Sequence, residues 1–303
     1  MNERTSTRAL ATREATVAGL RCLQLSAGQL SASVTVDVGP RIIAFHGPDG
    51  ISPFAIVPDL TIDCPGVGPF HLRGGHRLWH APEIAASTYL PDDAPVTVSV
   101  GGDDATFEVL EGPTALRKSL RVSFGEADLR IEHTITNEGS EPIELAPWAI
   151  TMLAVGGEAW IPQSLVPTDP DGLQANRSLV LWPYSRLSDS RLTIDDDLLR
   201  LRAVADAPSP FKIGTQTDPG WLAYRLGSQL FVKRARHDWD ADYNDLGASL
   251  QCYSGGQFIE VETLGPLVSL APGATTLHRE TWSLHTVDPT AGPAATIAQL
   301  GLG

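Results

Sequence analysis

The segment HLRGGHRLWHAPE, residues 71–83, holds the densest group of side chains in this sequence that could do chemistry. Three histidines, two arginines, a tryptophan and a glutamate surround the pair Gly74-Gly75. His76 could act as an acid or base, and Arg73 and Arg77 could hold hydroxyl or anionic oxygens. Alternatively, these side chains only pair with some of the 36 acidic residues. We expect the segment to face a polar ligand.

A metal site is the other chemistry that this segment suggests. His76, His80 and Glu83 have a spacing that suits zinc only if the segment is helical. The glycine pair and Pro82 are unfavourable inside a helix. We therefore predict no metal here.

A second candidate segment is QFIEVETLGP, residues 257–266, which follows a turn at Ser254-Gly255-Gly256. Its alternation predicts a strand that places Phe258, Glu260 and Glu262 on one face, with alternate residues about 7 Å apart. Two carboxylates beside an aromatic ring could bind sugar hydroxyls, or one could act as a general base. The alternative is that both carboxylates face water.

The acidic segment HDWDADYND, residues 237–245, resembles a calcium loop in its alternate aspartates. Its sixth position is Tyr243 instead of glycine, and its twelfth is Ser249 instead of glutamate, which excludes an EF-hand. A looser calcium site formed by Asp238–Asp242 and a solvated acidic loop both remain open.

Tryptophans offer flat apolar faces on which a sugar ring could stack. Trp79, Trp148, Trp182 and Trp239 are the candidates, and we expect at most two of them in a site because most tryptophans in a sandwich are core. The sequence has no GxSxG, P-loop or GxGxxG motif. Serine hydrolase, nucleotide-binding and Rossmann interpretations are therefore set aside.

Alternating apolar and polar residues recur along the whole chain. Val34, Val36 and Val38 share one face of a predicted strand, and similar runs follow every 8 to 15 residues. Only the last turn or two shows a helical pattern, and no fixed-period repeat or low-complexity linker is visible. We predict one large all-β sandwich over residues 16–288, with a flexible N-terminus at 1–15 and a C-terminal tail at 289–303.

The totals exclude several classes of protein. A net charge of −14 and a pI near 4.9 argue against non-specific binding to nucleic acid or anionic membranes. Cys22, Cys64 and Cys252 are odd in number and widely spaced, which indicates neither a disulfide framework nor a zinc ribbon. No secretory signal or membrane-spanning run is visible. We expect a cytoplasmic protein without a cofactor.

With these motifs in view, the chain resembles the galactose-mutarotase-like superfamily, which includes the aldose 1-epimerases, and within it an uncharacterised bacterial branch. The resemblance rests on segments in one order along the chain: DVGPRII (37–43), LRGGHRLWHAPE (72–83), PDDAPV (91–96), ITNEGSEPIELAPWAITMLAVGG (135–157), NRSLVLWPYS (176–185), LFVKR (230–234) and FIEVETLGP (258–266). It implies a single large β-supersandwich domain with a sugar-binding cleft on a concave face.

The resemblance also implies roles for particular residues. In aldose 1-epimerases a glutamate on a strand near the C-terminus removes the anomeric hydroxyl proton, and a histidine protonates the ring oxygen. Glu262 matches that glutamate. The positions of the family's two histidines match Trp148 and Arg73 here, so His76 is the substitute we expect for the acid.

We therefore expect a carbohydrate-binding isomerase of the aldose 1-epimerase type, acting on a free, phosphorylated or carboxylated sugar. Its predicted catalytic residues are Glu262 and His76. Its predicted substrate-binding residues are Arg73, Arg77, Trp79, Glu260, Trp148 and Arg41. Because both usual histidines are missing, a non-catalytic sugar-binding or regulatory module is the alternative. A lyase or glycoside-processing enzyme in the same cleft ranks third. The sequence does not indicate an oligomeric state.

Overall fold

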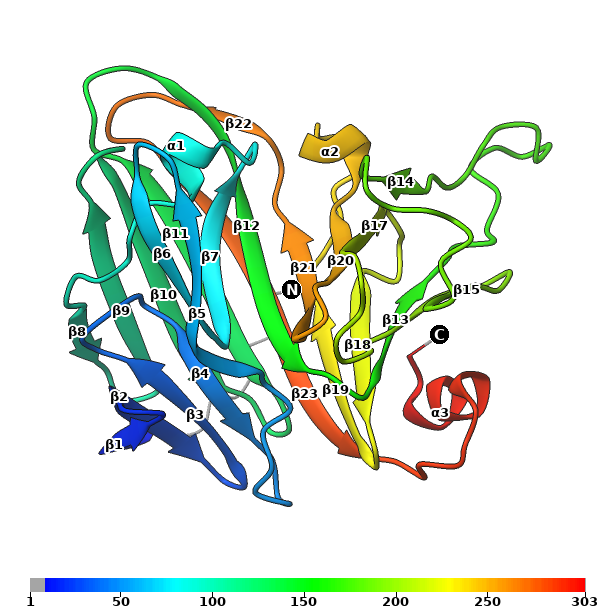
Figure 1. Ribbon diagram of the computed structural model, residues 1–303, viewed down its shortest axis with the longest axis horizontal. Helices are drawn as coiled ribbons and strands as arrows, with labels where there is room; N and C mark the ends of the chain where they lie inside the picture. The colour runs from blue at the N-terminus through cyan, green and yellow to red at the C-terminus, as the bar shows by residue number, and fades with distance from the viewer. Residues whose placement is uncertain (1–8, 303) are drawn as a thin grey trace.

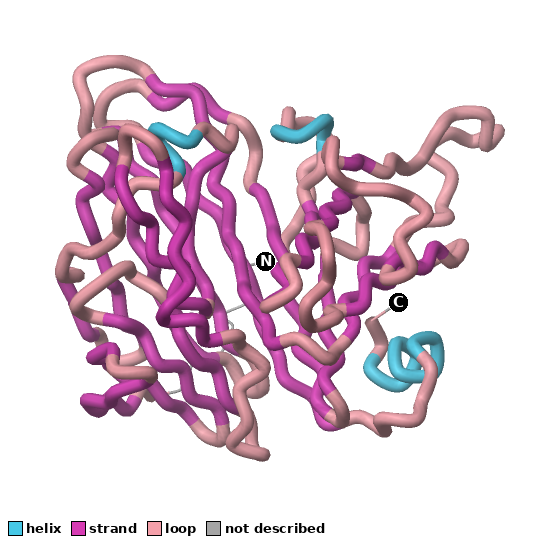
Figure 2. The backbone as a smooth tube through the Cα atoms, viewed as in Figure 1, coloured by secondary structure: helices cyan, strands magenta, loops and turns pink. Residues whose placement is uncertain are grey.

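Two large antiparallel sheets build most of the chain in the computed structural model, which describes residues 9–302 (Figure 1). Figure 2 shows strands running through most of the molecule, connected by loops, and the described residues form three short helices at the periphery. This confirms the predicted all-β class. The helices are α1 (Ala85–Thr88), α2 (Asn244–Gly247) and α3 (Pro293–Leu300), and none of the helices within the described residues is long and apolar enough to span a membrane.

The first sheet carries most of the predicted site residues. In spatial order it contains β1 (Ala11–Val17), β2 (Leu20–Ala27), β3 (Leu30–Thr35), β4 (Ile42–His46), β7 (His76–Ala81), β12 (Ile143–Ala154), β21 (Phe258–Leu264), β20 (Leu250–Ser254), β17 (Phe211–Thr215) and β14 (Val180–Leu181), with β22 (Val268–Leu270) paired to β12. Strands from the N-terminal, middle and C-terminal parts of the chain therefore meet at its centre.

The second sheet packs against the first. Its spatial order is β15 (Leu192–Ile194), β16 (Leu198–Arg202), β13 (Glu158–Pro162), β18 (Trp221–Leu226), β19 (Gln229–Arg234), β23 (Thr275–Thr286), β11 (Leu129–Asn137), β10 (Leu116–Phe124), β9 (Asp104–Glu111) and β8 (Thr97–Val100). A separate hairpin pairs β5 (Ile56–Cys64) with β6 (Gly68–Gly74).

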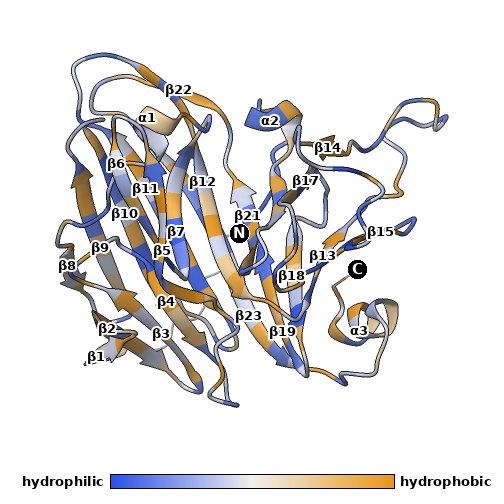
Figure 3. Ribbon diagram, viewed as in Figure 1, coloured by the Kyte–Doolittle hydropathy of each residue, from blue (hydrophilic) through white to orange (hydrophobic). Residues whose placement is uncertain are grey.

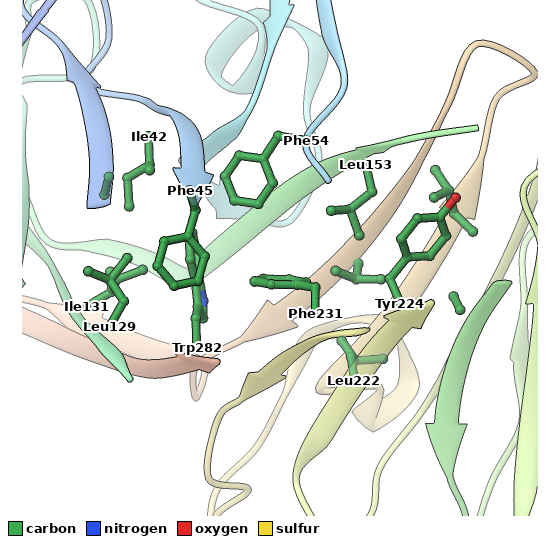
Figure 4. Packing of buried hydrophobic residues seen from close by; sticks show 14 of the residues in the cluster. Ile42, Phe45, Phe54, Leu129, Ile131, Leu153, Leu222, Tyr224, Phe231 and Trp282 are labelled. Carbon is green, nitrogen blue, oxygen red and sulfur yellow. The ribbon is translucent and has the colours of Figure 1, made fainter. Parts of the chain in front are cut away.

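Side chains that alternate along the strands build the core between the sheets. Figure 3 shows apolar and polar residues alternating on both sheets, as period-two strands require. At the centre, Phe54 lies edge-on to Phe231 with ring centroids 5.8 Å apart, and Phe231 lies 5.4 Å from Trp282 (Figure 4). Phe45 completes this aromatic group, so both sheets contribute to one continuous core.

The predicted limit at residue 15 lies inside β1, and the predicted limit between residues 288 and 289 lies in the connection between β23 and α3. β1 begins at Ala11 and pairs with β2 along its length. At the other end, Leu302 packs with Trp221, whose indole N–H donates to the Leu302 carbonyl at 2.7 Å. The part of the predicted flexible N-terminus at residues 1–8 lies outside the described residues.

The glycine pair of the segment 71–83 forms the junction between β6 and β7. Gly74 has a φ of +98°, and a Cβ there would lie 2.0 Å from the Ala55 carbonyl oxygen. Gly75 has a φ of +69°, and a Cβ there would lie 2.5 Å from the Ile42 carbonyl oxygen. Only glycine allows this close approach. The segment is thus two strands joined by a tight turn.

Candidate functional site

A polar cleft lies on the outer face of the first sheet, over its central strands. β7, β12, β21, β20 and β17 run side by side there. The cleft has a volume of about 260 Å³. Its lining comprises Ile62, Leu72, Arg77, Trp79, Glu83, Tyr89, Trp148, Tyr184, Pro210, Lys212, Tyr253, Phe258, Glu260 and Glu262. Aromatic rings and charged groups are thus mixed in one site, as is common for small-molecule pockets.

Strand register explains why the charged residues converge. Glu262 pairs with Ile150 of β12, and Ile150 pairs with Arg77 of β7. Directly opposed residues project to the same side of a sheet. Arg77 and Glu262 therefore share a face although 185 positions separate them in the sequence. The same rule places Glu260, two residues before Glu262, on that face.

Glu262 is fully buried at the floor of the cleft and is only half satisfied by the protein. Its Oε2 accepts hydrogen bonds from the Trp148 indole N–H at 2.8 Å and from Lys212 Nζ at 2.9 Å. Its Oε1 has no hydrogen-bond partner. A buried carboxylate oxygen without a partner is unfavourable by about 1–3 kcal/mol or more. A ligand hydroxyl that donates to Oε1 would remove this cost.

Lys212 balances the charge of Glu262 and lies among aromatic rings. Its Nζ lies 4.6 Å from the ring centroids of both Trp148 and Trp182. An ammonium above an indole face is attracted by the ring quadrupole. The ion pair and the two rings together hold the ammonium next to the Glu262 carboxylate.

Arg77 and Glu260 form the second ion pair of the cleft. Arg77 Nη2 donates to Glu260 Oε1 at 3.0 Å, and its guanidinium lies 4.1 Å from the Trp79 ring centroid. The Nε and Nη1 atoms of Arg77 are buried without a partner. Burial raises the pKa of Glu260, Arg77 opposes that rise, and the nearby Glu262 adds to it. The Nε and Nη1 atoms of Arg77 can therefore donate hydrogen bonds to a ligand.

Three tyrosines stand around the cleft. Burial raises the pKa of Tyr253 to about 12, with a contribution from the Glu260 and Glu262 carboxylates. Burial likewise raises the pKa values of Tyr89 and Tyr184. Tyr89 donates its hydroxyl to Glu83 at the rim. All three phenols stay protonated near neutral pH, so Tyr184 and Tyr253 can donate to sugar oxygens.

Five of the predicted site residues meet in this cleft. They are Glu262, Glu260, Arg77, Trp79 and Trp148. Lys212 and the tyrosines were missed by the sequence analysis. The alternation in FKIGT marks Lys212 as a strand residue, but its position beside Glu262 depends on the pairing of β17 with β20, which no local motif encodes.

His76 does not reach the cleft. It neighbours Arg77 on β7, and successive strand residues point to opposite faces. Its ring is fully buried between the sheets, where Nδ1 lies 2.9 Å from Thr151 Oγ1 and Nε2 lies 2.9 Å from His133 Nε2. Burial holds the pKa of His76 well below its usual range. The expected pairing of His76 with Glu262 across one cleft is therefore not found.

Arg73 and Arg41 also lie outside the cleft. Arg73 Nη1 lies 2.6 Å from Asp92, and its Nη2 contacts Asp93. Arg41 is fully buried, donates to Asp92 at 2.7 Å and donates to the Leu72 carbonyl at 2.9 Å. These two arginines fasten the segment around Asp92 to β6 and do not line the cleft.

The acidic segment 237–245 runs into α2. Asp238, Asp240 and Asp242 are exposed, and Asp238 Oδ1 accepts the backbone N–H of Asp240 at 3.1 Å. His237 stacks on Tyr243 with ring centroids 4.6 Å apart. These local contacts order the loop from within.

Solved structures with the same architecture identify the fold. A candidate mutarotase from Salmonella typhimurium aligns with a TM-score of 0.57 and 12% identity over 92% of this chain and 94% of its own. A candidate aldose 1-epimerase from Klebsiella pneumoniae aligns with a TM-score of 0.57 and 10% identity over 97% of this chain and 88% of its own. The chain therefore has the galactose-mutarotase-like fold, as the sequence motifs predicted.

A third structure is larger than this chain. It is a TPR-domain containing protein from Parabacteroides distasonis, with a TM-score of 0.59 and 15% identity. The alignment covers 91% of this chain but only 49% of that protein, so the chain spans about half its length. No protein-family model and no curated protein sequence matches the chain.

Proposed function

We propose that the cleft binds an aldose and that the chain is an isomerase of the aldose 1-epimerase type, with Glu262 as the general base. The observation that carries this proposal is the unpartnered Oε1 of Glu262, which is buried at the floor of an aromatic-lined cleft. The anomeric hydroxyl of a bound sugar would donate to it. The likeness in fold to the two candidate sugar isomerases supports the same class.

The charge balance of the cleft favours an uncharged sugar. Lys212 offsets Glu262, and Arg77 offsets Glu260, while Glu83 adds a negative charge at the rim. A neutral aldose would add no unpaired charge to a poorly solvated site. The two free donors of Arg77 would bind hydroxyl oxygens, and Trp79 would pack on the apolar side of the ring.

The proposed reaction opens and recloses the sugar ring. Glu262 removes the proton from the anomeric oxygen, the bond between C1 and the ring oxygen breaks, and the ring oxygen takes up a proton. Rotation about C1–C2 and the reverse steps give the other anomer. Lys212 is the proposed donor to the ring oxygen in place of His76, because its ammonium lies 2.9 Å from Glu262 and both reacting oxygens are bonded to C1.

Anomeric exchange measured by NMR tests this function. The panel comprises glucose, galactose, their 6-phosphates and a uronic acid. We expect the wild type to accelerate exchange of at least one neutral aldose, and Glu262→Gln to lower that rate by at least ~100-fold. Lys212→Met should lower it similarly. Glu144→Gln, which alters an exposed carboxylate on β12, is the matched control and should retain the rate.

Two outcomes would contradict the proposal. Full activity in Glu262→Gln would exclude this glutamate as the base. Acceleration confined to the phosphorylated or carboxylated sugars would exclude the neutral substrate class.

A non-catalytic sugar-binding module is the second candidate. The observation that favours it is that no histidine is among the described residues that line the cleft. Saturable binding of a sugar by the wild type, without any acceleration of exchange across the panel, would support this module and reject the isomerase.

A further inference from the structure

A second polar cluster lies between the two sheets, on the opposite side of the first sheet from the cleft. It brings together His76 of β7, His133 of β11 and Glu280 of β23. All three side chains are buried. The proposed sugar reaction uses none of them.

The three facing atoms form a compact triangle. His76 Nε2 lies 2.9 Å from His133 Nε2, and Glu280 Oε2 lies 3.7 Å from the former and 3.9 Å from the latter. A triangle with these sides has a circumscribed radius of about 2.1 Å, so one point lies about 2.1 Å from all three atoms. Zinc binds imidazole nitrogen at about 2.0–2.1 Å and carboxylate oxygen at about 2.0–2.2 Å.

We propose that His76, His133 and Glu280 bind one divalent transition-metal ion of the zinc type. Two imidazoles and one carboxylate form a donor set that zinc uses when it keeps a further position open. His133 and Glu280 are far from His76 in the sequence. This set therefore differs from the local spacing of His76, His80 and Glu83, for which no metal site was predicted.

The surroundings of His76 suit a metal ligand. Its Nδ1 lies 2.9 Å from Thr151 Oγ1, which can accept the Nδ1–H and so leave the Nε2 lone pair for the ion. Metal-bound histidines commonly donate their other ring N–H in this way. The His76 Nε2 lone pair then accepts a hydrogen bond from His133 Nε2, and ion binding would release this shared proton.

The Glu280 carboxylate can also bind the ion with its Oε2 atom. Lys233 Nζ lies 2.9 Å from Glu280 Oε1, which is not the oxygen of the triangle. The Trp282 indole N–H donates to Oε2 at 3.1 Å. A carboxylate oxygen offers two lone-pair positions, so Oε2 can accept this hydrogen bond and bind an ion.

A cavity adjoins two of the three proposed ligands. It has a volume of about 170 Å³, and its lining includes His76, His133, Leu78 and Leu120. A single water needs far less volume than this, about 10–15 Å³ on the same measure. A usable metal site requires an entry path, and this cavity reaches the two histidine ligands.

Cobalt titration of the chelator-treated full chain tests the proposal. We expect one Co²⁺ per chain with visible d–d absorption, displaced by one equivalent of Zn²⁺. His133→Gln and Glu280→Gln should each weaken Co²⁺ binding by at least ~10-fold. His285→Gln is the matched control, because His285 also lies on β23 but bonds Ser283 at 2.8 Å, and it should leave binding unchanged.

A second measurement uses only the wild type, so it does not depend on whether the variants fold. X-ray absorption of the zinc-loaded wild type should show two imidazole ligands and oxygen at the metal. Failure of the folded wild type to bind Co²⁺ or Zn²⁺ stoichiometrically would overturn the proposal. So would a metal shell without imidazole, or unchanged binding in both folded ligand variants.

Discussion

Lys212 Nζ lies 2.9 Å from Glu262 Oε2, and the two side chains are 4% and 0% exposed. The lysine comes from β17 and the glutamate from β21, with β20 between them in the sheet. This ion pair is the only contact by which the protein neutralises the carboxylate at the floor of the cleft, within the part of the chain that the structure describes.

Removal of Lys212 should destabilise the fold because it leaves the Glu262 carboxylate buried without its cation. Lys212→Met is expected to lower the free energy of unfolding by about 3–5 kcal/mol. The double variant Lys212→Met/Glu262→Gln should be more stable than the sum of the two single changes predicts. Urea unfolding of all four proteins measures this coupling, and additive effects would contradict a structural ion pair.

Gly74 should not tolerate a side chain. Gly74→Ala places a Cβ 2.0 Å from the Ala55 carbonyl oxygen in a backbone with φ of +98°, and we expect a loss of at least ~2 kcal/mol in unfolding free energy. Gly102→Ala is the matched control, because no atom lies within 4 Å of a Cβ there. Equal stability of the two variants would show that the β6–β7 junction can shift.

His80 should make the fold sensitive to acid. Burial, aided by the Lys118 ammonium and opposed by Glu111, lowers the pKa of His80 to about 4 from its usual 6.5. Between these values the unfolded chain binds the proton and the folded chain does not, so stability falls as the pH drops from about 6.5 to about 4. The loss attributable to His80 is about 3 kcal/mol.

Urea unfolding at several pH values measures this effect. We expect His80→Gln to show a shallower decline in stability between pH 6.5 and 4 than the wild type. Parallel declines in the two proteins would mean that His80 titrates normally in the folded state.

Arg41 should matter for stability and not for ligand binding. Its guanidinium joins Asp92 to the Leu72 carbonyl in a fully buried position. Lysine cannot reproduce these divergent hydrogen bonds, so Arg41→Lys is expected to cost at least ~2 kcal/mol in chemical denaturation. Arg21→Lys, which alters an exposed pair with Asp37, should change stability by less than ~0.5 kcal/mol. Equal effects of the two variants would contradict this role.

Much of the architecture could be predicted from local patterns. The alternation of Leu129, Ile131, His133 and Ile135 indicates one strand face, and all four side chains are buried on β11. The order of the motifs along the chain predicted the galactose-mutarotase-like fold. The period of a strand and the order of motifs can both be recognised from the sequence alone. Neither requires knowledge of which strands pair with one another.

Positions of site residues could be predicted from the sequence only where the residues lie on the same strand. Glu260 and Glu262 lie two residues apart on β21, so the alternation of the strand predicted that they share a face. His76 and Arg77 are adjacent and were assigned to one site because residues 71–83 were interpreted as a ligand-facing segment and not as a strand, on which neighbours face opposite sides. Lys212 required the long-range pairing of β17, β20 and β21, which the sequence does not display.

The central positions of β21 and β23 have a consequence for how the chain folds. β21 lies between β12 and β20 in the first sheet, and β23 lies between β11 and β19 in the second. Both strands belong to the last 46 residues of the sequence. Each sheet therefore consists of two separate halves with unpaired inner edges until this C-terminal part is available. Such late, non-local pairing slows folding and exposes strand edges to aggregation, so we expect a newly made chain to need protection until its last strands are added.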